Sequence, residues 1–106
     1  MNLKEKVISI MPRLENHWPD IAGLFKMKLI PEKTTLLEEG DISKYLFIVS
    51  KGCLRQYRLK EDGKEITIQF FFEKQMVASM ESAFTEKPGN LYLESIEESE
   101  IIMIRL

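Results

Sequence analysis

The chain has 106 residues, 44% of them hydrophobic, and a formal net charge of −2, which is the size and composition of one folded domain with a single core. Its 15 basic residues are scattered along the sequence, so this domain alone is a poor candidate for gripping a nucleic-acid backbone. No apolar run approaches the roughly 18 residues that span a bilayer, and no secretory signal begins the chain. We therefore expect a cytoplasmic protein without membrane partners.

The first 25 residues are predicted to form a helical segment, followed by a β domain over residues 26–106. Asn2 stands at the N-cap position of the first helix, and Pro12 should kink or end that helix near Met11. The apolar stripe of this helix consists of Leu3, Val7, Ile10 and Leu14. A second short helix, starting at Pro19-Asp20, is predicted to place three apolar side chains on the sheet: Ile21, Leu24 and Phe25.

From Lys26 onward, short strands alternate with turn signals, at the spacing of an all-β roll, sandwich or barrel. The predicted strands are 26–30, 34–38, 45–50, 53–59, 65–72, 91–96 and 99–106. Four residues between them are interpreted as structural turn positions, because glycine tolerates positive φ and aspartate accepts backbone N–H groups. They are Gly40, Asp41, Gly52 and Gly63.

Three local patterns in the β domain give sharper expectations. In strand 45–50, Phe47 and Val49 point to one face and Leu46 and Ile48 to the other, which suits a strand buried on both faces. In strand 65–72 the two-residue period predicts a core face made of Ile66, Ile68, Phe70 and Phe72. Asp62-Gly63 predicts a tight hairpin turn in which both central residues have positive φ.

The ionisable residues suggest no chemistry. The acidic group Glu94, Glu97, Glu98 and Glu100 is interpreted as a solvated strand end and turn. His17 beside Trp18 could belong to a stacking or metal site, although a surface or capping role is the simpler interpretation. Cys53 follows a glycine turn, which favours a buried unreactive thiol over a redox sensor. With one histidine and one cysteine, we expect no catalytic residues, no metal and no enzymatic activity.

The stretch LLEEGDISKYLFIVSKGCLRQYRLKEDGKEITIQFF resembles the core of the cyclic-nucleotide-binding domain of Crp/Fnr-type bacterial transcription regulators. The matching positions are Glu39, Gly40, Asp41, Tyr45, Phe47, Ile48, Val49, Gly52, Arg55 and Tyr57. The resemblance extends over residues 24–106 and implies a mainly β fold with short helices, a double-stranded, jelly-roll-like β-roll. Cupins share this architecture, and a short helix near residues 79–84 would distinguish the cyclic-nucleotide type from them.

Residues 77–90, VASMESAFTEKPGN, fall where this family carries its phosphate-binding cassette. The resemblance implies a Gly-Glu pair and an arginine that hold the ribose and the cyclic phosphate. Here Ala78-Ser79 or Ser79-Met80 occupies the place of the pair, and no arginine lies between Arg58 and Arg105. We therefore expect no cofactor and no ordinary binding of cyclic AMP or cyclic GMP. The candidate effector pocket consists of Ser79, Met80, Glu81, Ser82, Lys87, Asn90 and Tyr92.

Three interpretations of this segment stay open. Ser79 or Ser82 could cap a short helix whose free N–H groups accept a carboxylate or a small anion. An apolar effector could pack among Met76, Met80, Phe84 and Tyr92. In the third interpretation, Met76, Met80 and Phe84 close the open end of the roll as part of its core.

The leading functional hypothesis is the sensory domain of a Crp/Fnr-type regulator, with an unknown small-molecule effector. The resemblance implies a full-length homodimer that reaches DNA through a C-terminal helix-turn-helix domain, preceded by a dimerisation helix. Neither is present here, so we expect the chain to be a fragment that stops after its last strand. The alternative is a stand-alone β-roll that binds a ligand or another protein and never meets DNA.

Overall fold

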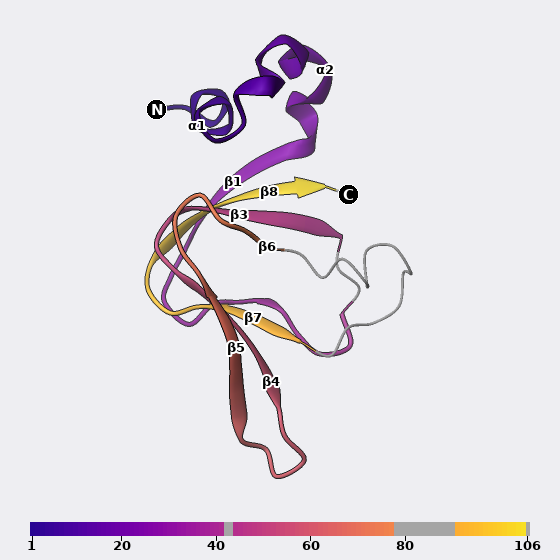
Figure 1. Cartoon of the computed structure of the whole chain (residues 1–106), viewed down its shortest axis with the longest axis vertical. Coiled ribbons are helices and arrows are strands. Elements are labelled where there is room, and N and C mark those ends of the chain that lie inside the picture. Colours follow the sequence, from indigo (N-terminus) through magenta and orange to yellow (C-terminus); the bar gives the residue numbers. More distant parts are fainter. Residues whose placement is uncertain (42–43, 78–90, 106) are drawn as a thin grey trace.

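The computed structural model describes residues 1–41, 44–77 and 91–105, which form short helices and two four-stranded antiparallel sheets (Figure 1). Along the first sheet the strands are β1 (Phe25–Ile30), β8 (Ser99–Arg105), β3 (Tyr45–Lys51) and β6 (Met76–Val77). Along the second they are β2 (Thr35–Leu37), β7 (Tyr92–Ser95), β4 (Leu54–Leu59) and β5 (Glu65–Phe71). The mainly β roll predicted from the sequence is confirmed. The two-residue strand β6 was not predicted.

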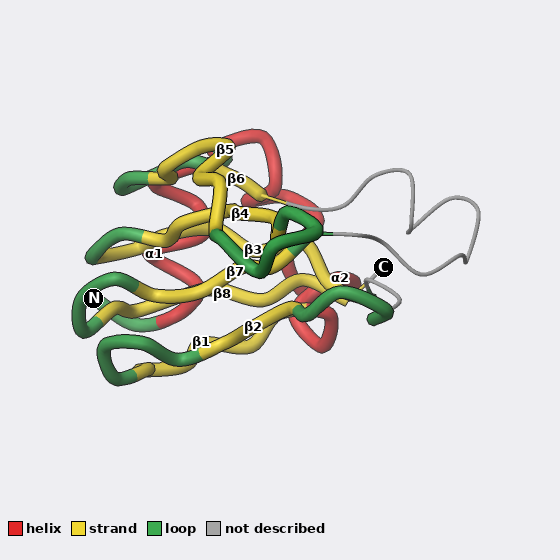
Figure 2. Tube along the Cα trace, turned by 90° about the horizontal axis from the view of Figure 1, so that it is seen from below, coloured by secondary structure: helices red, strands yellow, loops and turns green. Residues whose placement is uncertain are grey.

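The N-terminal residues form four short helical turns that cover the outer face of the first sheet. They are α1 (Leu3–Ile10), η1 (Pro12–His17), α2 (Trp18–Ile21) and η2 (Ala22–Leu24). The Asn2 side chain accepts a hydrogen bond from the backbone N–H of Glu5 at 2.8 Å, and α1 ends at Ile10, two residues before Pro12. Figure 2 shows the strands running side by side across the molecule, with the helices on the far side.

The prediction that Leu24 packs on the sheet was wrong. Its side chain is 46% exposed, whereas the next residue, Phe25, is buried. Leu24 is the last residue of the helical turn η2, and Phe25 opens strand β1. Phe25 packs in the cluster that contains Ile102 and the helices, whereas Leu24 stays at the surface.

Strand β3 separates two hydrophobic clusters, as its alternating pattern predicted. Phe47 and Val49 belong to the cluster between the two sheets, and Ile48 belongs to the cluster between the first sheet and the helices. The inter-sheet core also contains Ile30, Leu54, Phe71, Val77, Leu93 and Ile101. The first sheet is therefore the middle layer of three, covered by helices on one face and by the second sheet on the other.

The predicted core face of strand β5 was wrong. Ile68 and Phe70 are 49% and 43% exposed and Phe72 is 58% exposed, whereas Phe71 is buried in the inter-sheet core. The ladder between β4 and β5 shifts register between Gln56 and Tyr57, which inserts an extra residue into β5. A shift of one residue exchanges the two faces of a strand. The outer half of the hairpin also projects beyond β2 and β7, the other strands of the second sheet (Figure 1).

The tip of this hairpin is a longer loop than the expected two-residue turn. The Lys60 N–H donates to the Lys64 carbonyl at 2.8 Å, and the Gly63 N–H donates to the Lys60 carbonyl at 2.9 Å. Gly63 has a φ of 83°, and Asp62 is not among the residues with positive φ. This is the pattern of a three-residue loop whose last residue is left-handed.

Glu100, expected in a solvated turn, is buried under helix α1. The Lys6 Nζ lies 2.5 and 2.7 Å from its two carboxylate oxygens, and the Ser50 hydroxyl donates to it at 3.0 Å. These contacts, with Lys6 first among them, hold the pKa of the Glu100 carboxyl below its ordinary value. Packing of α1 on the sheet brings the lysine to a position 94 residues away in the chain.

Gly52 is expected to tolerate no side chain. Its φ is 98°, and a Cβ atom there would lie 2.8 Å from the Ser99 Cα. Gly52→Ala should therefore lower the free energy of unfolding by about 3 kcal/mol or more, because left-handed strain and a backbone clash add. Gly63→Ala is the matched control, since Gly63 has a φ of 83° but nothing within 4 Å of the new Cβ, and should cost about 1 kcal/mol. Equal losses in urea unfolding would contradict the predicted clash.

The Lys6–Glu100 pair predicts a defined pH dependence. Because the folded pKa of Glu100 lies below its ordinary value of 4.5, its contribution is present above about pH 4.5 and is lost as the pH falls through the folded pKa. Lys6→Met should cost about 3 kcal/mol at pH 7, since it leaves a buried carboxylate without its cation. Part of that loss should be recovered near pH 5, because protonation then neutralises Glu100.

Lys4→Met is the control for this prediction, because Lys4 lies exposed on the same helix. Urea unfolding of both variants at pH 7 and pH 5 measures the effect. If Lys6→Met and Lys4→Met unfold alike at both pH values, the ion pair does not stabilise the fold.

Candidate functional site

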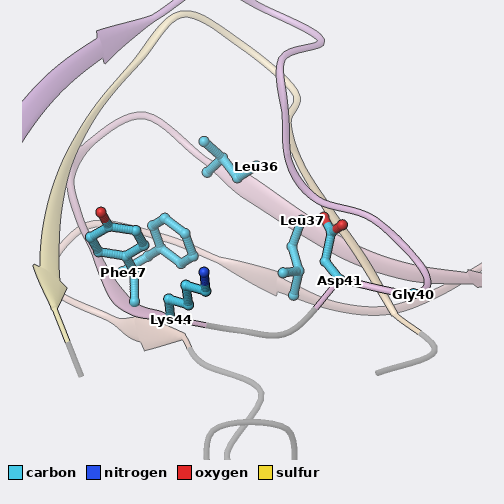
Figure 3. Close-up of a pocket in the computed structure, with 7 residues that line it drawn as sticks. Leu36, Leu37, Gly40, Asp41, Lys44 and Phe47 are labelled. Carbon is cyan, nitrogen blue, oxygen red and sulfur yellow. The ribbon is translucent and has the colours of Figure 1, made fainter. Parts of the chain in front are cut away.

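A hollow of about 430 Å³ opens at one end of the roll, where the two sheets diverge (Figure 3). Strand β2 of the second sheet forms one wall and the start of strand β3 of the first sheet forms the other, with the turn between them at the rim. The described residues that line it are Leu36, Leu37, Gly40, Asp41, Lys44, Tyr45 and Phe47. Its volume is within the range typical of small-molecule sites.

The rim of the hollow is a turn closed by Asp41. The Asp41 carboxylate accepts the backbone N–H of Glu38 at 2.8 Å, and the Asp41 N–H donates to the Glu38 carbonyl at 3.0 Å. Gly40 lies between Glu38 and Asp41 and has a φ of 95°. This left-handed conformation lets the chain reverse its direction within the turn. These residues, predicted as structural turn positions, therefore also shape the mouth of the hollow.

The floor of the hollow is the inter-sheet core. Phe47 belongs to that core, and Leu36, Leu37 and Tyr45 pack against it while remaining partly accessible. Because these side chains are held by the packing of both sheets, the apolar walls exist before any ligand arrives.

The hollow lies beside both ends of the predicted cassette segment. Strand β6 ends at Val77, which pairs with Phe47 across the first sheet. Strand β7, which follows the segment, pairs through Leu93 with Leu37. Each wall therefore shares a hydrogen-bonded ladder with the strand that leads into or out of residues 78–90.

Most of the predicted effector pocket lies outside the described residues: Ser79, Met80, Glu81, Ser82, Lys87 and Asn90. The same holds for the helix expected near residues 79–84. Tyr92 is described, and its ring stacks on Tyr57 with the centroids 5.0 Å apart; it is not among the residues that line the hollow. Met76 is 43% exposed, so it does not contribute to the described core.

Arg55 forms the centre of a charged network on the second sheet that sequence reasoning missed. Its guanidinium lies 2.5 Å from Glu94 and 2.7 Å from Glu65, and 4.1 Å from the centre of the Tyr57 ring. Burial raises the pKa of the Tyr57 hydroxyl, with the two carboxylates adding to the effect. Glu94 is therefore paired and half-buried, contrary to the prediction of a solvated acidic group. The network fixes β4, β5 and β7 to one another.

The remaining candidate groups show no reactive environment. Cys53 is buried, and burial raises the pKa of its thiol, which disfavours the nucleophilic thiolate. His17 is exposed at the end of η1. Within residues 1–41, 44–77 and 91–105 no group of three His, Cys, Asp or Glu side chains could hold a metal ion. Of the helices described, none is long and apolar enough to cross a membrane.

None of the seven described lining residues was in the predicted effector pocket. Gly40 and Asp41 were predicted as turn positions, and the other five had no predicted site role: Leu36, Leu37, Lys44, Tyr45 and Phe47. The sequence assigned four of these five to strands but did not show that those strands line a hollow. The signal available beforehand was the Gly40-Asp41 turn, because a binding loop is often held by a rigid turn.

Comparison with known proteins places the chain in a family. The sequence model described as cyclic nucleotide-binding domain matches residues 27–106. No curated protein sequence matched.

Three solved structures illustrate the likeness in fold. Catabolite Activator Protein from Thermus thermophilus is 20% identical, with a TM-score of 0.73 over 86% of this chain and 42% of that one. The sensor domain of the transcriptional regulator DNR from Pseudomonas aeruginosa is 12% identical, with a TM-score of 0.81 over 96% of this chain and 70% of that one. The cAMP-bound structure of PfPKA-R is 17% identical, with a TM-score of 0.79 over 99% of this chain and 40% of that one.

At these sequence identities, the three structures show that the fold is shared, but they do not identify a ligand or a function for this chain. The chain spans less than half the length of the Thermus protein and of PfPKA-R. The family match covers about three quarters of the chain, and the two antiparallel sheets are those of its β-roll. The chain belongs to the cyclic nucleotide-binding domain family.

Proposed function

We propose that this domain is the effector-sensing part of a cytoplasmic Crp/Fnr-type transcription regulator, and that it senses without catalysis and without ordinary cyclic-nucleotide binding. The observation that carries the proposal is the hollow between β2 and β3, which has preformed apolar walls and a turn-stabilised rim. A concave apolar site with a few polar groups at its edge is the usual form of a small-molecule site.

A cyclic nucleotide would bring a negatively charged phosphate for which this chain offers few cationic partners. A phosphate that leaves water needs charge-assisted hydrogen bonds, worth about 1.5–3 kcal/mol each. The chain has no arginine between Arg58 and Arg105. Arg55 is bound to Glu94 and Glu65, and Arg58 lies exposed on the projecting hairpin. Arg55 is therefore already neutralised by two carboxylates.

The regulator assignment is supported by likeness to the sensor domain of DNR. The fold is about equally similar to that of PfPKA-R, which was solved with cAMP bound, and a β-roll module without DNA binding is the competing function. In the regulator, an effector that prefers one of two arrangements of a homodimer would shift the DNA-binding equilibrium by its differential affinity.

Calorimetric titration with cyclic AMP and cyclic GMP tests the nucleotide part of the proposal. We expect no saturable binding at micromolar concentrations, because the loss of the arginine and the Gly-Glu pair removes several orders of magnitude in affinity. PfPKA-R, whose solved structure contains cAMP, is the positive control. Micromolar binding of either nucleotide to this chain would overturn the proposal.

The coding sequence beyond residue 106 tests the regulator part. We expect a long helix with a heptad-like apolar pattern, followed by a helix-turn-helix. The expressed full-length protein should then sediment as a dimer and bind DNA fragments from its own promoter region. A stop codon directly after Leu106 would overturn the regulator assignment in favour of the stand-alone module.

A further inference from the structure

We propose that the hollow binds a small amphipathic monoanion, a molecule with an apolar body and one carboxylate, and that Lys44 is the residue that recognises its charge. This inference rests on the proposed sensing function and assigns a ligand class to the same site. The first observation that supports it is the apolar character of the residues that line the hollow. Four of the seven described lining residues are leucine or aromatic: Leu36, Leu37, Tyr45 and Phe47.

The charges around the hollow leave one cation available to a ligand. Among the described lining residues only Asp41 and Lys44 are charged. The Asp41 carboxylate is occupied by the backbone N–H of Glu38. The three ion pairs within the described part of the chain involve Lys6 and Arg55 and do not include Lys44. Lys44 therefore offers a positive charge that no described carboxylate neutralises.

The direction of the Lys44 side chain supports this role. Figure 3 shows it reaching from the residue before β3 into the hollow, toward the space between Phe47 and Leu37. Lys44 is exposed, so its ammonium group can meet an anion at the mouth of the hollow without first leaving another charged partner among the described residues. An anion with an apolar body would gain binding free energy from its contact with Lys44 and from the burial of its apolar surface against the walls.

Asp41 sets the limit on the ligand's charge. Its carboxylate lines the same hollow and repels a second negative charge. One cation and one fixed carboxylate therefore favour a monoanion over a dianion. A neutral apolar molecule would use the walls alone and gain nothing from Lys44.

The test uses three probe compounds in calorimetric titrations of the whole chain. They are 4-phenylbutyrate, which has both features, 4-phenylbutanol, which lacks the charge, and butyrate, which lacks the aromatic body. We expect 4-phenylbutyrate to bind about tenfold or more tightly than either of the others, since a charge-assisted contact changes affinity by roughly that factor.

Substitutions at Lys44 separate its charge from its bulk. Lys44→Met keeps the length of the side chain and should weaken 4-phenylbutyrate about tenfold while leaving 4-phenylbutanol unchanged. Lys44→Arg should retain affinity for 4-phenylbutyrate within about threefold, because it preserves the charge. Lys60→Met, at the exposed tip of the β4–β5 hairpin, is the matched control and should bind all three compounds as the parent chain does. Urea unfolding checks that all variants are folded.

The outcomes discriminate between this inference and the proposed function. If 4-phenylbutanol binds as tightly as 4-phenylbutyrate, or if Lys44→Met leaves 4-phenylbutyrate affinity unchanged, the anion assignment is overturned while the hollow remains a binding site. If none of the three compounds binds the parent chain, the ligand class is also overturned. The proposed function is tested separately: the stop codon described above would overturn the regulator assignment, and micromolar cyclic-nucleotide binding would overturn the exclusion of cyclic nucleotides.

Discussion

The burial of β3 on both faces is the constraint on which the rest of the structure depends. Phe47 and Val49 join the two sheets, and Ile48 joins the first sheet to the N-terminal helices. A polar side chain on either face of this strand would lie without water in one of the two clusters. The same strand supplies Phe47 to the floor of the hollow. The geometry of the candidate site is therefore a direct result of the packing that holds the layers together.

Two ion pairs attach outlying parts of the chain to this core, and both use carboxylates near its C-terminal end. Glu100 holds α1 through Lys6, and Glu94 holds the β4–β5 hairpin through Arg55. The two partners of each pair lie far apart in the sequence, and both pairs are largely shielded from solvent. Such pairs specify an arrangement more than they add net stability, because desolvation offsets much of their attraction. They fix how the helices and the hairpin sit against the roll.

Sequence reasoning predicted what depends on local pattern. The end of α1 before Pro12, the two-faced burial of β3, and seven of the eight strands follow from spacing, capping and turn chemistry. It did not predict the features that depend on contacts between distant parts of the chain. The buried face of β5 depends on a register shift opposite Gln56 and Tyr57, which no periodicity reveals. The roles of Glu94 and Glu100 depend on partners that only the folded chain brings near. The walls of the hollow come from strands of different sheets, so their proximity could not be read from either strand alone.

The two walls of the hollow are coupled to the family's cassette position by main-chain pairing. Phe47 pairs with Val77 at the entry to residues 78–90, and Leu37 pairs with Leu93 just after their exit. Main-chain pairing does not depend on which side chains the strands carry. The side chains that line the hollow can therefore change, and with them the molecules that fit it, while the pairing of these strands stays the same.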